Sequence, residues 1–263
     1  MRTSIFAAVL GLSLVGCLVG DEGTPGTTGG GDPNGTGSGS NTGSGTGSGS
    51  GSGVTPTPKL DVTLDKPTVS AELLSSSMVT VTFHASGGFS GPVGITATAV
   101  DGNSAAIPGW TVTLDKSTVN VAADGTATAV ATVQIPSDSA VATGTLKVDT
   151  TSSLGPASQT APVNVAKQLT VNLTLNGANC VYPTAMVGTI KVANGTKIRW
   201  VNGDAAANIT VHISAGVGGL NHQQGATPPA GVYEQTVSAT SGTTDWYCHN
   251  RNDPKNMNLQ AVP

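Results

Sequence analysis

The sequence predicts an all-β protein built from short strands and many turns. Valine, threonine, serine, alanine and glycine dominate the 263 residues, glycine alone counts 36, and aromatic residues make up only 3%. Apolar and polar residues alternate in runs such as 79–83 and 127–133, which is the period of a half-buried strand. Turn-forming pairs such as Asp101-Gly102 separate these runs. We therefore expect sheets and not a large helical core.

The first 17 residues form a predicted lipoprotein signal peptide. Arg2 supplies the positive start, and residues 5–15 form an apolar run of signal-peptide length. This run is shorter than the roughly 20 apolar residues of a membrane-spanning helix. It ends in Leu-Val-Gly-Cys at 14–17, which resembles the lipobox cut by the lipoprotein signal peptidase. A chance cysteine in an ordinary signal peptide is the alternative interpretation.

The lipobox resemblance implies a mature protein that is anchored through a lipid on Cys17. Such a protein lies in the cell envelope, outside the cytoplasm, and its partner there is the membrane. Leu18 follows the cysteine where an aspartate would retain the protein at the inner membrane, so the usual sorting rule favours the outer membrane. Residues 18–58 are nearly all glycine, serine, threonine and proline. Such a segment cannot bury apolar surface, so we expect a disordered tether.

Residues 59–166 form a predicted β-sandwich. The sequence Val-Thr-Leu-Asp-Lys occurs at 62–66 and again at 112–116, each time followed one residue later by Thr-Val. Short alternating strands with regular turn signals are typical of an antiparallel sandwich, and the segment resembles bacterial Ig-like spacer domains. His84 is the single histidine here, so we assign this domain no chemistry. Trp110 is expected in its core, with a binding platform as the alternative.

Residues 167–263 form a second predicted all-β domain, and they hold most of the residues that could carry chemistry. Three of the four histidines and two of the three cysteines of the chain lie here. Asn194-Gly195 predicts a hairpin turn. The absence of a helical period favours a Greek-key barrel or sandwich. We expect strands at 169–175, 187–192, 197–201, 209–214, 232–237, 244–249 and 258–262.

Two stretches of this domain resemble the cupredoxin family. Asn-Gly-Thr-Lys-Ile-Arg-Trp-Val-Asn at 194–202 resembles the cupredoxin strand Gly-Asp-x-Val-x-Trp-x-Asn, and Asp-Trp-Tyr-Cys-His at 245–249 resembles the end of the cupredoxin ligand strand. Met257 stands where the family often has its axial methionine. The resemblance covers about a third of the chain. It implies a cupredoxin-like Greek-key fold and a copper site.

A blue-copper site needs a thiolate, two imidazoles and commonly a weak thioether. The resemblance implies Cys248 as the thiolate and Met257 as the thioether. The family's two histidine positions fall on Asn208 and Arg251, neither of which is a histidine. The site is therefore either rearranged or lost.

Other histidines supply the imidazoles in a rearranged site. His212 and His249 are the candidates, with His222 as a substitute. Together these three residues form an alternative, thiolate-free site for copper or zinc, because imidazole suits both metals.

A disulfide competes with copper for one of the sulfur atoms. With Cys17 lipidated, Cys180 and Cys248 form an even pair in an oxidising compartment. Their disulfide would stabilise the fold by roughly 4 kcal/mol through the unfolded chain. It would also consume the copper thiolate, so the two interpretations of Cys248 exclude each other.

Two functions follow from these alternatives. The first is a membrane-anchored copper protein for electron transfer or copper handling, with a redox or copper-delivery protein as its partner. The second is a metal-free structural or binding lipoprotein closed by the disulfide. An enzyme is not expected, because the chain lacks a nucleophile elbow, a Ser-His-Asp spacing and a phosphate loop. The net charge of −4 and the absence of a basic run argue against nucleic-acid binding.

Overall fold

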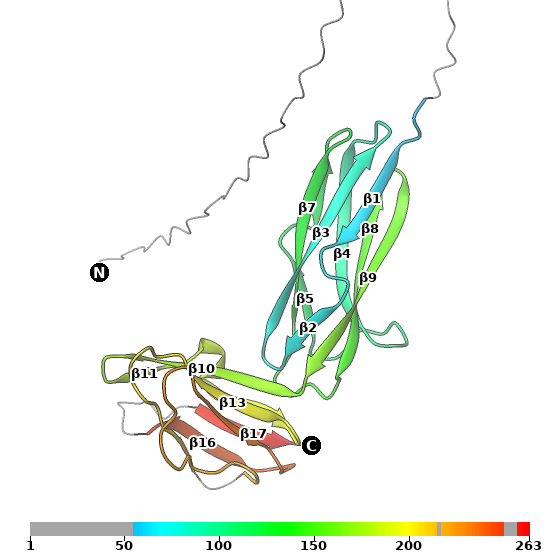
Figure 1. Ribbon diagram of the computed structural model, residues 1–263. Coiled ribbons are helices and arrows are strands. Elements are labelled where there is room, and N and C mark those ends of the chain that lie inside the picture. Colours follow the sequence, from blue (N-terminus) through cyan, green and yellow to red (C-terminus); the bar gives the residue numbers. More distant parts are fainter. Residues whose placement is uncertain (1–54, 215–216, 250–256) are drawn as a thin grey trace, which may run out of the picture. The chain divides into compact units, whose positions relative to one another are not determined.

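The fold is seen in a computed structural model, which describes residues 55–214, 217–249 and 257–263. The predicted signal peptide, the predicted lipidation site Cys17 and the predicted linker as far as residue 54 lie outside the described residues. The regular elements of the described chain are strands, apart from one short 3-10 helix, so the predicted all-β class is confirmed (Figure 1). No helix in this part of the chain is long and apolar enough to cross a membrane.

The first set of strands forms a sandwich of two sheets. One sheet has the order β1-β3-β7-β5 and the other has the order β2-β9-β8-β4-β6. The strands are β1 (Lys59–Leu64), β2 (Val69–Glu72), β3 (Ser76–Ser86), β4 (Gly91–Val100), β5 (Thr111–Leu114), β6 (Thr118–Val121), β7 (Thr126–Gln134), β8 (Thr143–Ser152) and β9 (Gly155–Ala166).

Strand alternation builds the core of this sandwich. On β3, Val79, Val81 and Phe83 are fully buried, whereas His84 is exposed on the other face. Trp110 is also buried, and its indole N–H donates a hydrogen bond to the Ser139 hydroxyl at 2.8 Å. The core interpretation of Trp110 is therefore confirmed.

The repeated sequence Val-Thr-Leu-Asp-Lys of this sandwich corresponds to a structural repeat. The Asp65 carboxylate, just after β1, accepts the backbone N–H of Thr80 at 2.8 Å. The Asp115 carboxylate, just after β5, accepts the backbone N–H of Val130 at 2.6 Å. After each aspartate the chain crosses to the other sheet, as β2 in the first copy and β6 in the second. Each copy of the repeated sequence thus precedes the same crossing from one sheet to the other.

The second set of strands forms another pair of sheets. Their orders are β11-β10-β13-β15 and β12-β17-β16-β14, with β10 parallel to β13 and β12 parallel to β17. Strand β11 and the 3-10 helix η1 have no counterpart among the predicted segments. The elements are β10 (Gln168–Asn176), β11 (Asn179–Val181), η1 (Thr184–Met186), β12 (Gly188–Ala193), β13 (Lys197–Asn202), β14 (Val211–Ile213), β15 (Val232–Thr236), β16 (Thr243–Cys248) and β17 (Met257–Val262).

The Asn194-Gly195 turn does not make the predicted hairpin. Gly195 has a φ of 83°, so a tight turn is present between β12 and β13. The two strands nevertheless belong to different sheets, each paired in parallel with another partner. Each strand has buried residues that face the space between the sheets, such as Val192 and Ile198, and separate sheets allow both sets to be buried together. The hairpin prediction is therefore wrong, although the turn was located correctly.

Two tryptophans occupy the space between the sheets of this second sandwich. Trp200 on β13 and Trp246 on β16 are 1% and 0% exposed, and their ring centroids lie 5.9 Å apart. They belong to different sheets, so this contact holds the two layers together. The burial of Trp246 also determines which face of β16 points to the core, because the residues before and after it on that strand must point away from the core.

Candidate metal centre

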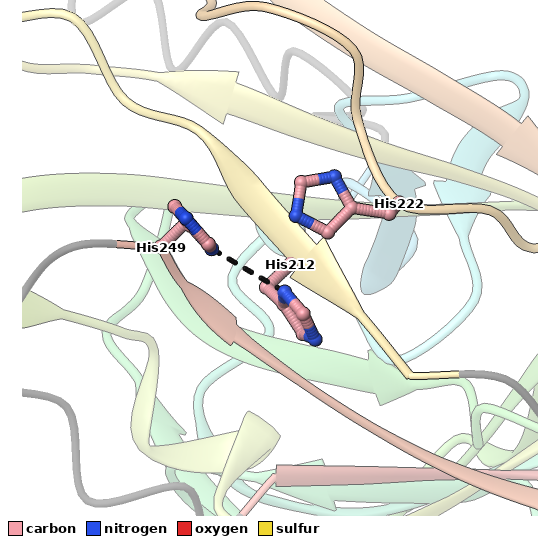
Figure 2. A group of neighbouring side chains, drawn as sticks. All are labelled: His212, His222 and His249. Atoms are coloured by element: carbon pink, nitrogen blue, oxygen red, sulfur yellow. Dashed lines mark hydrogen bonds between the residues drawn. The ribbon is translucent and has the colours of Figure 1, made fainter.

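Three histidines converge on one side of the second sandwich. His212 lies on β14, His222 lies in the loop between β14 and β15, and His249 is the first residue after β16. One ring nitrogen from each lies within 4.8 Å of the others (Figure 2). All three side chains are partly buried. The sequence placed all three among the candidate metal ligands, and the fold brings them together.

The pairing of β14 with β16 determines where His212 points. His212 is opposite Tyr247, and the two rings stack with centroids 4.5 Å apart and planes 25° apart. Residues on either side of this pair, such as Ile213 and Trp246, are buried between the sheets. Alternation therefore places His212 and Tyr247 together on the outer face of the sheet.

His249 is held beside His212 by the same strand pairing. Its backbone N–H donates to the Thr210 carbonyl at 2.8 Å, which extends the pairing of β14 and β16 by one step. The Nδ1 atoms of His249 and His212 are 3.3 Å apart, with ring planes 14° apart (Figure 2). One of these nitrogens carries the proton that the other accepts. Two nitrogen ligands on a tetrahedral ion lie at a similar separation, roughly 3.3 Å.

His222 approaches this pair from another direction. Its ring is perpendicular to His212, at 89°, and nearly so to His249, at 78°. Its Nδ1 lies 2.6 Å from the carbonyl oxygen of Gln223, so this nitrogen donates its proton to the backbone. The lone pair of the neutral ring is then on Nε2. A backbone carbonyl that orients a histidine in this way is typical of metal sites.

Gln223 connects the His222 loop to the His212 strand. Its side chain is buried; its carbonyl accepts the backbone N–H of Val211 at 2.8 Å, and its amide donates to the Thr227 hydroxyl at 2.7 Å. Its backbone N–H donates to the Val211 carbonyl at 3.2 Å. Sequence reasoning missed this residue, because nothing in the run His-Gln-Gln distinguishes a buried glutamine from an exposed one.

Tyr233 on β15 supports the start of the same loop. Its hydroxyl donates to the Asn221 carbonyl at 2.7 Å. Burial raises the pKa of the Tyr233 phenol above its ordinary value, so the hydroxyl is protonated and donates at neutral pH. The residues flanking His222 on both sides are therefore tied to strands.

The predicted thiolate ligand is instead part of a disulfide. Cys180 on β11 and Cys248 at the end of β16 are bonded, with Cα atoms 6.2 Å apart, which confirms the predicted pair. A sulfur in a disulfide is not a thiolate, so the prediction that Cys248 is a copper ligand is wrong. The side chain of Cys248 is also fully buried, on the face of β16 opposite Tyr247.

The predicted thioether ligand lies on the wrong side of the sheet. Met257 pairs with Trp246 across β16 and β17, and it is 1% exposed. Directly opposite residues of an antiparallel pair share a face, so Met257 points inward with Trp246. His212 points outward. Met257 therefore does not join the histidines, and the four-ligand blue-copper set is split between two faces.

Two histidine positions of the family and two carboxylates were also named from the sequence. Asn208 lies exposed before β14, and Arg251 lies outside the described residues. The Asp204 carboxylate accepts backbone N–H groups in the loop after β13, and Glu234 on β15 pairs with Arg199. Neither carboxylate belongs to the histidine group.

Comparisons with known proteins show little. No protein-family model matches the chain, and no curated protein matches it. Among solved structures, domains 4 and 5 of the S-layer protein SbsC share 19% identity over 42% of this chain and 54% of that chain, with a TM-score of 0.30. The chain thus spans about half of that structure. The chaperone DraB of E. coli shares 10% identity over 78% of this chain and 97% of that chain, also with a TM-score of 0.30.

A third structure has a similar score. The SafA pilin of Salmonella enterica in complex with the SafB chaperone matches at 9% identity, over 77% of this chain and 96% of that chain, with a TM-score of 0.31. At these scores the likeness carries no argument about function. The function must be argued from the histidine centre itself.

Proposed function

We propose that this protein is a lipid-anchored protein of the cell envelope whose C-terminal sandwich binds copper through His212, His222 and His249. The observation that carries the proposal is the convergence of three ring nitrogens within 4.8 Å. Imidazole is a ligand for both copper and zinc. For a given nitrogen site, Cu(II) binds more tightly than Zn(II), so copper is the expected occupant.

Two further observations support the choice of copper and of the compartment. The stretches that resemble cupredoxins lie on β13 and β16, and β16 ends at the histidine centre. The Cys180–Cys248 disulfide suits an oxidising compartment outside the cytoplasm. The lipobox at Cys17 and the linker after it suit the same location, with the outer membrane as the expected anchor.

The ligand set favours copper handling over electron transfer. A blue-copper centre owes its properties to a thiolate, and Cys248 has no thiolate to offer while it is bonded to Cys180. An imidazole-only centre at a partly exposed position is suited to taking up an ion and passing it on. Its partner would be a copper-delivery or copper-accepting protein.

Copper titration of the exported protein tests the proposal. Residues 1–17 are replaced by a cleavable, non-lipidating signal, so that the chain from Leu18 onward is secreted in soluble form with its disulfide intact and without the Cys17 thiol. Isothermal titration with Cu(II) is expected to give one equivalent, and electron paramagnetic resonance is expected to show nitrogen ligands. The variants His212→Ala and His249→Ala should lose this binding, whereas His84→Ala, which changes the exposed histidine of β3, should keep it.

A metal-free structural role is the second candidate, and the disulfide favours it. Cys180 and Cys248 tie β11 to β16 and close the fold without any metal. If the wild-type protein binds no copper, the copper proposal fails and this second function stands. If the histidine variants bind as well as His84→Ala, the copper lies elsewhere and the proposed centre is wrong.

A further inference from the structure

We infer that the three-histidine centre, once it holds copper, keeps one coordination position for a small anion from solution. This inference rests on the proposed function, because it concerns the same site. It adds the chemical class of a ligand, a small anion with a single donor atom, that the bound metal would take.

The protein supplies three donor atoms in the described part of the chain. The group gathers His212, His222 and His249, and no cysteine or carboxylate of the described residues belongs to it. Zn(II) and Cu(II) commonly take four or more ligands. Sites with three protein ligands complete their coordination with water, which other ligands can replace.

The centre lies where solvent reaches it. The three histidine side chains are partly exposed, whereas the layer beneath them is buried: Ile213, Trp246 and Cys248 all face the inside of the sandwich. Because all three rings are partly exposed, solvent reaches the centre, and we expect the ligand at the remaining position to exchange with solution.

The charge of the centre selects the ligand. Three neutral imidazoles leave the double positive charge of Cu(II) uncompensated, so an anion is favoured over a neutral ligand. Asp245 is the carboxylate to consider, because it lies on the same face of β16 as Tyr247, two residues away. It is not part of the histidine group. A small anion with one donor atom fits the single position that remains.

Azide is a suitable probe, because it is small, anionic and gives a charge-transfer band when it binds Cu(II). The secreted mature chain is loaded with copper, dialysed, and its copper-to-protein ratio is measured. Titration with sodium azide should then give a new saturable absorption band and a changed paramagnetic resonance spectrum, at one azide per copper. The His84→Ala variant should behave in the same way as the wild type.

Three results would overturn the inference. The first is an unchanged spectrum at saturating azide in a sample that holds one copper per chain, which shows a closed coordination sphere. The second is loss of copper to azide. The third is azide binding that appears only in Asp245→Asn, because the protein's own carboxylate would then fill the position. A copper-to-protein ratio near zero before azide is added shows instead that the proposed function has failed.

Discussion

The Nδ1 atoms of His212 and His249 lie 3.3 Å apart, although the residues are separated by 37 positions in the chain. The pairing of β14 with β16 produces this contact. Val211 is opposite Cys248, and the backbone N–H of His249 donates to Thr210. Because sheet hydrogen bonds fix both backbones, the fold itself positions the two rings. A ligand pair held in this way loses little conformational entropy when it binds an ion.

Copper is expected to stabilise the folded protein. An ion that binds only the native state raises the free energy of unfolding by about 2.7 kcal/mol at a free concentration of 100 times Kd. Thermal unfolding followed by circular dichroism should therefore show a higher Tm with Cu(II), and a chelator should reverse the shift. The shift should disappear in His249→Ala and persist in His84→Ala. An equal shift in both variants would place the copper elsewhere.

Gln223 is expected to set the affinity of the centre. Gln223→Leu removes the acceptor of the buried Val211 N–H and the donor to Thr227, so the loop that carries His222 loses its side-chain tie to β14 and keeps the backbone bond from Gln223 to Val211. We expect a loss of stability of about 1–3 kcal/mol from the unsatisfied group. Copper affinity should fall by about tenfold or more, as for residues that orient metal ligands.

The neighbouring glutamine is the control for this prediction. Gln224 is exposed, so Gln224→Leu should leave copper affinity unchanged. Affinity is measured by competition with a chelator of known strength, at a temperature where both variants are fully folded. If Gln223→Leu binds copper as tightly as Gln224→Leu, then Gln223 has only a structural role.

The sequence predicted the strands of this protein better than their partners. Alternation located β3, β7 and most strands of the second sandwich, because a half-buried strand needs that pattern whichever sheet it joins. The turn at Asn194-Gly195 was also visible, since only a few residue types accept its backbone geometry. The two strands that flank this turn pair with other strands and not with each other. Pairing depends on burying residues that lie far apart in the chain, and a local pattern does not contain that information.

The candidate site shows the same limit. The sequence named His212 and His249, with His222 as a substitute, as replacements for the family's missing histidines beside Cys248 and Met257, and it named the three histidines alone as the alternative site. Which residues share a face depends on register, here the alignment of His212 with Tyr247 and of Trp246 with Met257. A change of register by one residue would exchange the two faces. The sequence pattern alone could not distinguish these alternatives.

The Cys180–Cys248 disulfide is expected to make a large contribution to stability. The bond closes a loop of 68 residues, and the chain-entropy model gives a stabilisation of about 4 kcal/mol for such a loop. Replacing both cysteines by alanine should lower the free energy of unfolding, measured by urea unfolding, by a similar amount. A thiol assay of the secreted chain without Cys17, unfolded but not reduced, should find no free thiol. A wild-type protein with two titratable thiols would contradict this and restore the thiolate interpretation of Cys248.

The repeated aspartates of the first sandwich are expected to act as equivalent stabilising residues. Asp65 and Asp115 each accept a backbone N–H from the neighbouring strand at the point where the chain leaves the sheet. Asp65→Ala and Asp115→Ala should each reduce the free energy of unfolding by about 1 kcal/mol, the usual value of one hydrogen bond. Substitution by asparagine should cost less, because its carbonyl oxygen still accepts the bond. Asp61→Ala is the control: this residue forms a surface ion pair with Lys59, and such pairs contribute little. Urea unfolding of the five variants measures the differences. If only one of the two alanine variants is destabilised, the two copies of the repeated sequence share a geometry but do not contribute equally to stability.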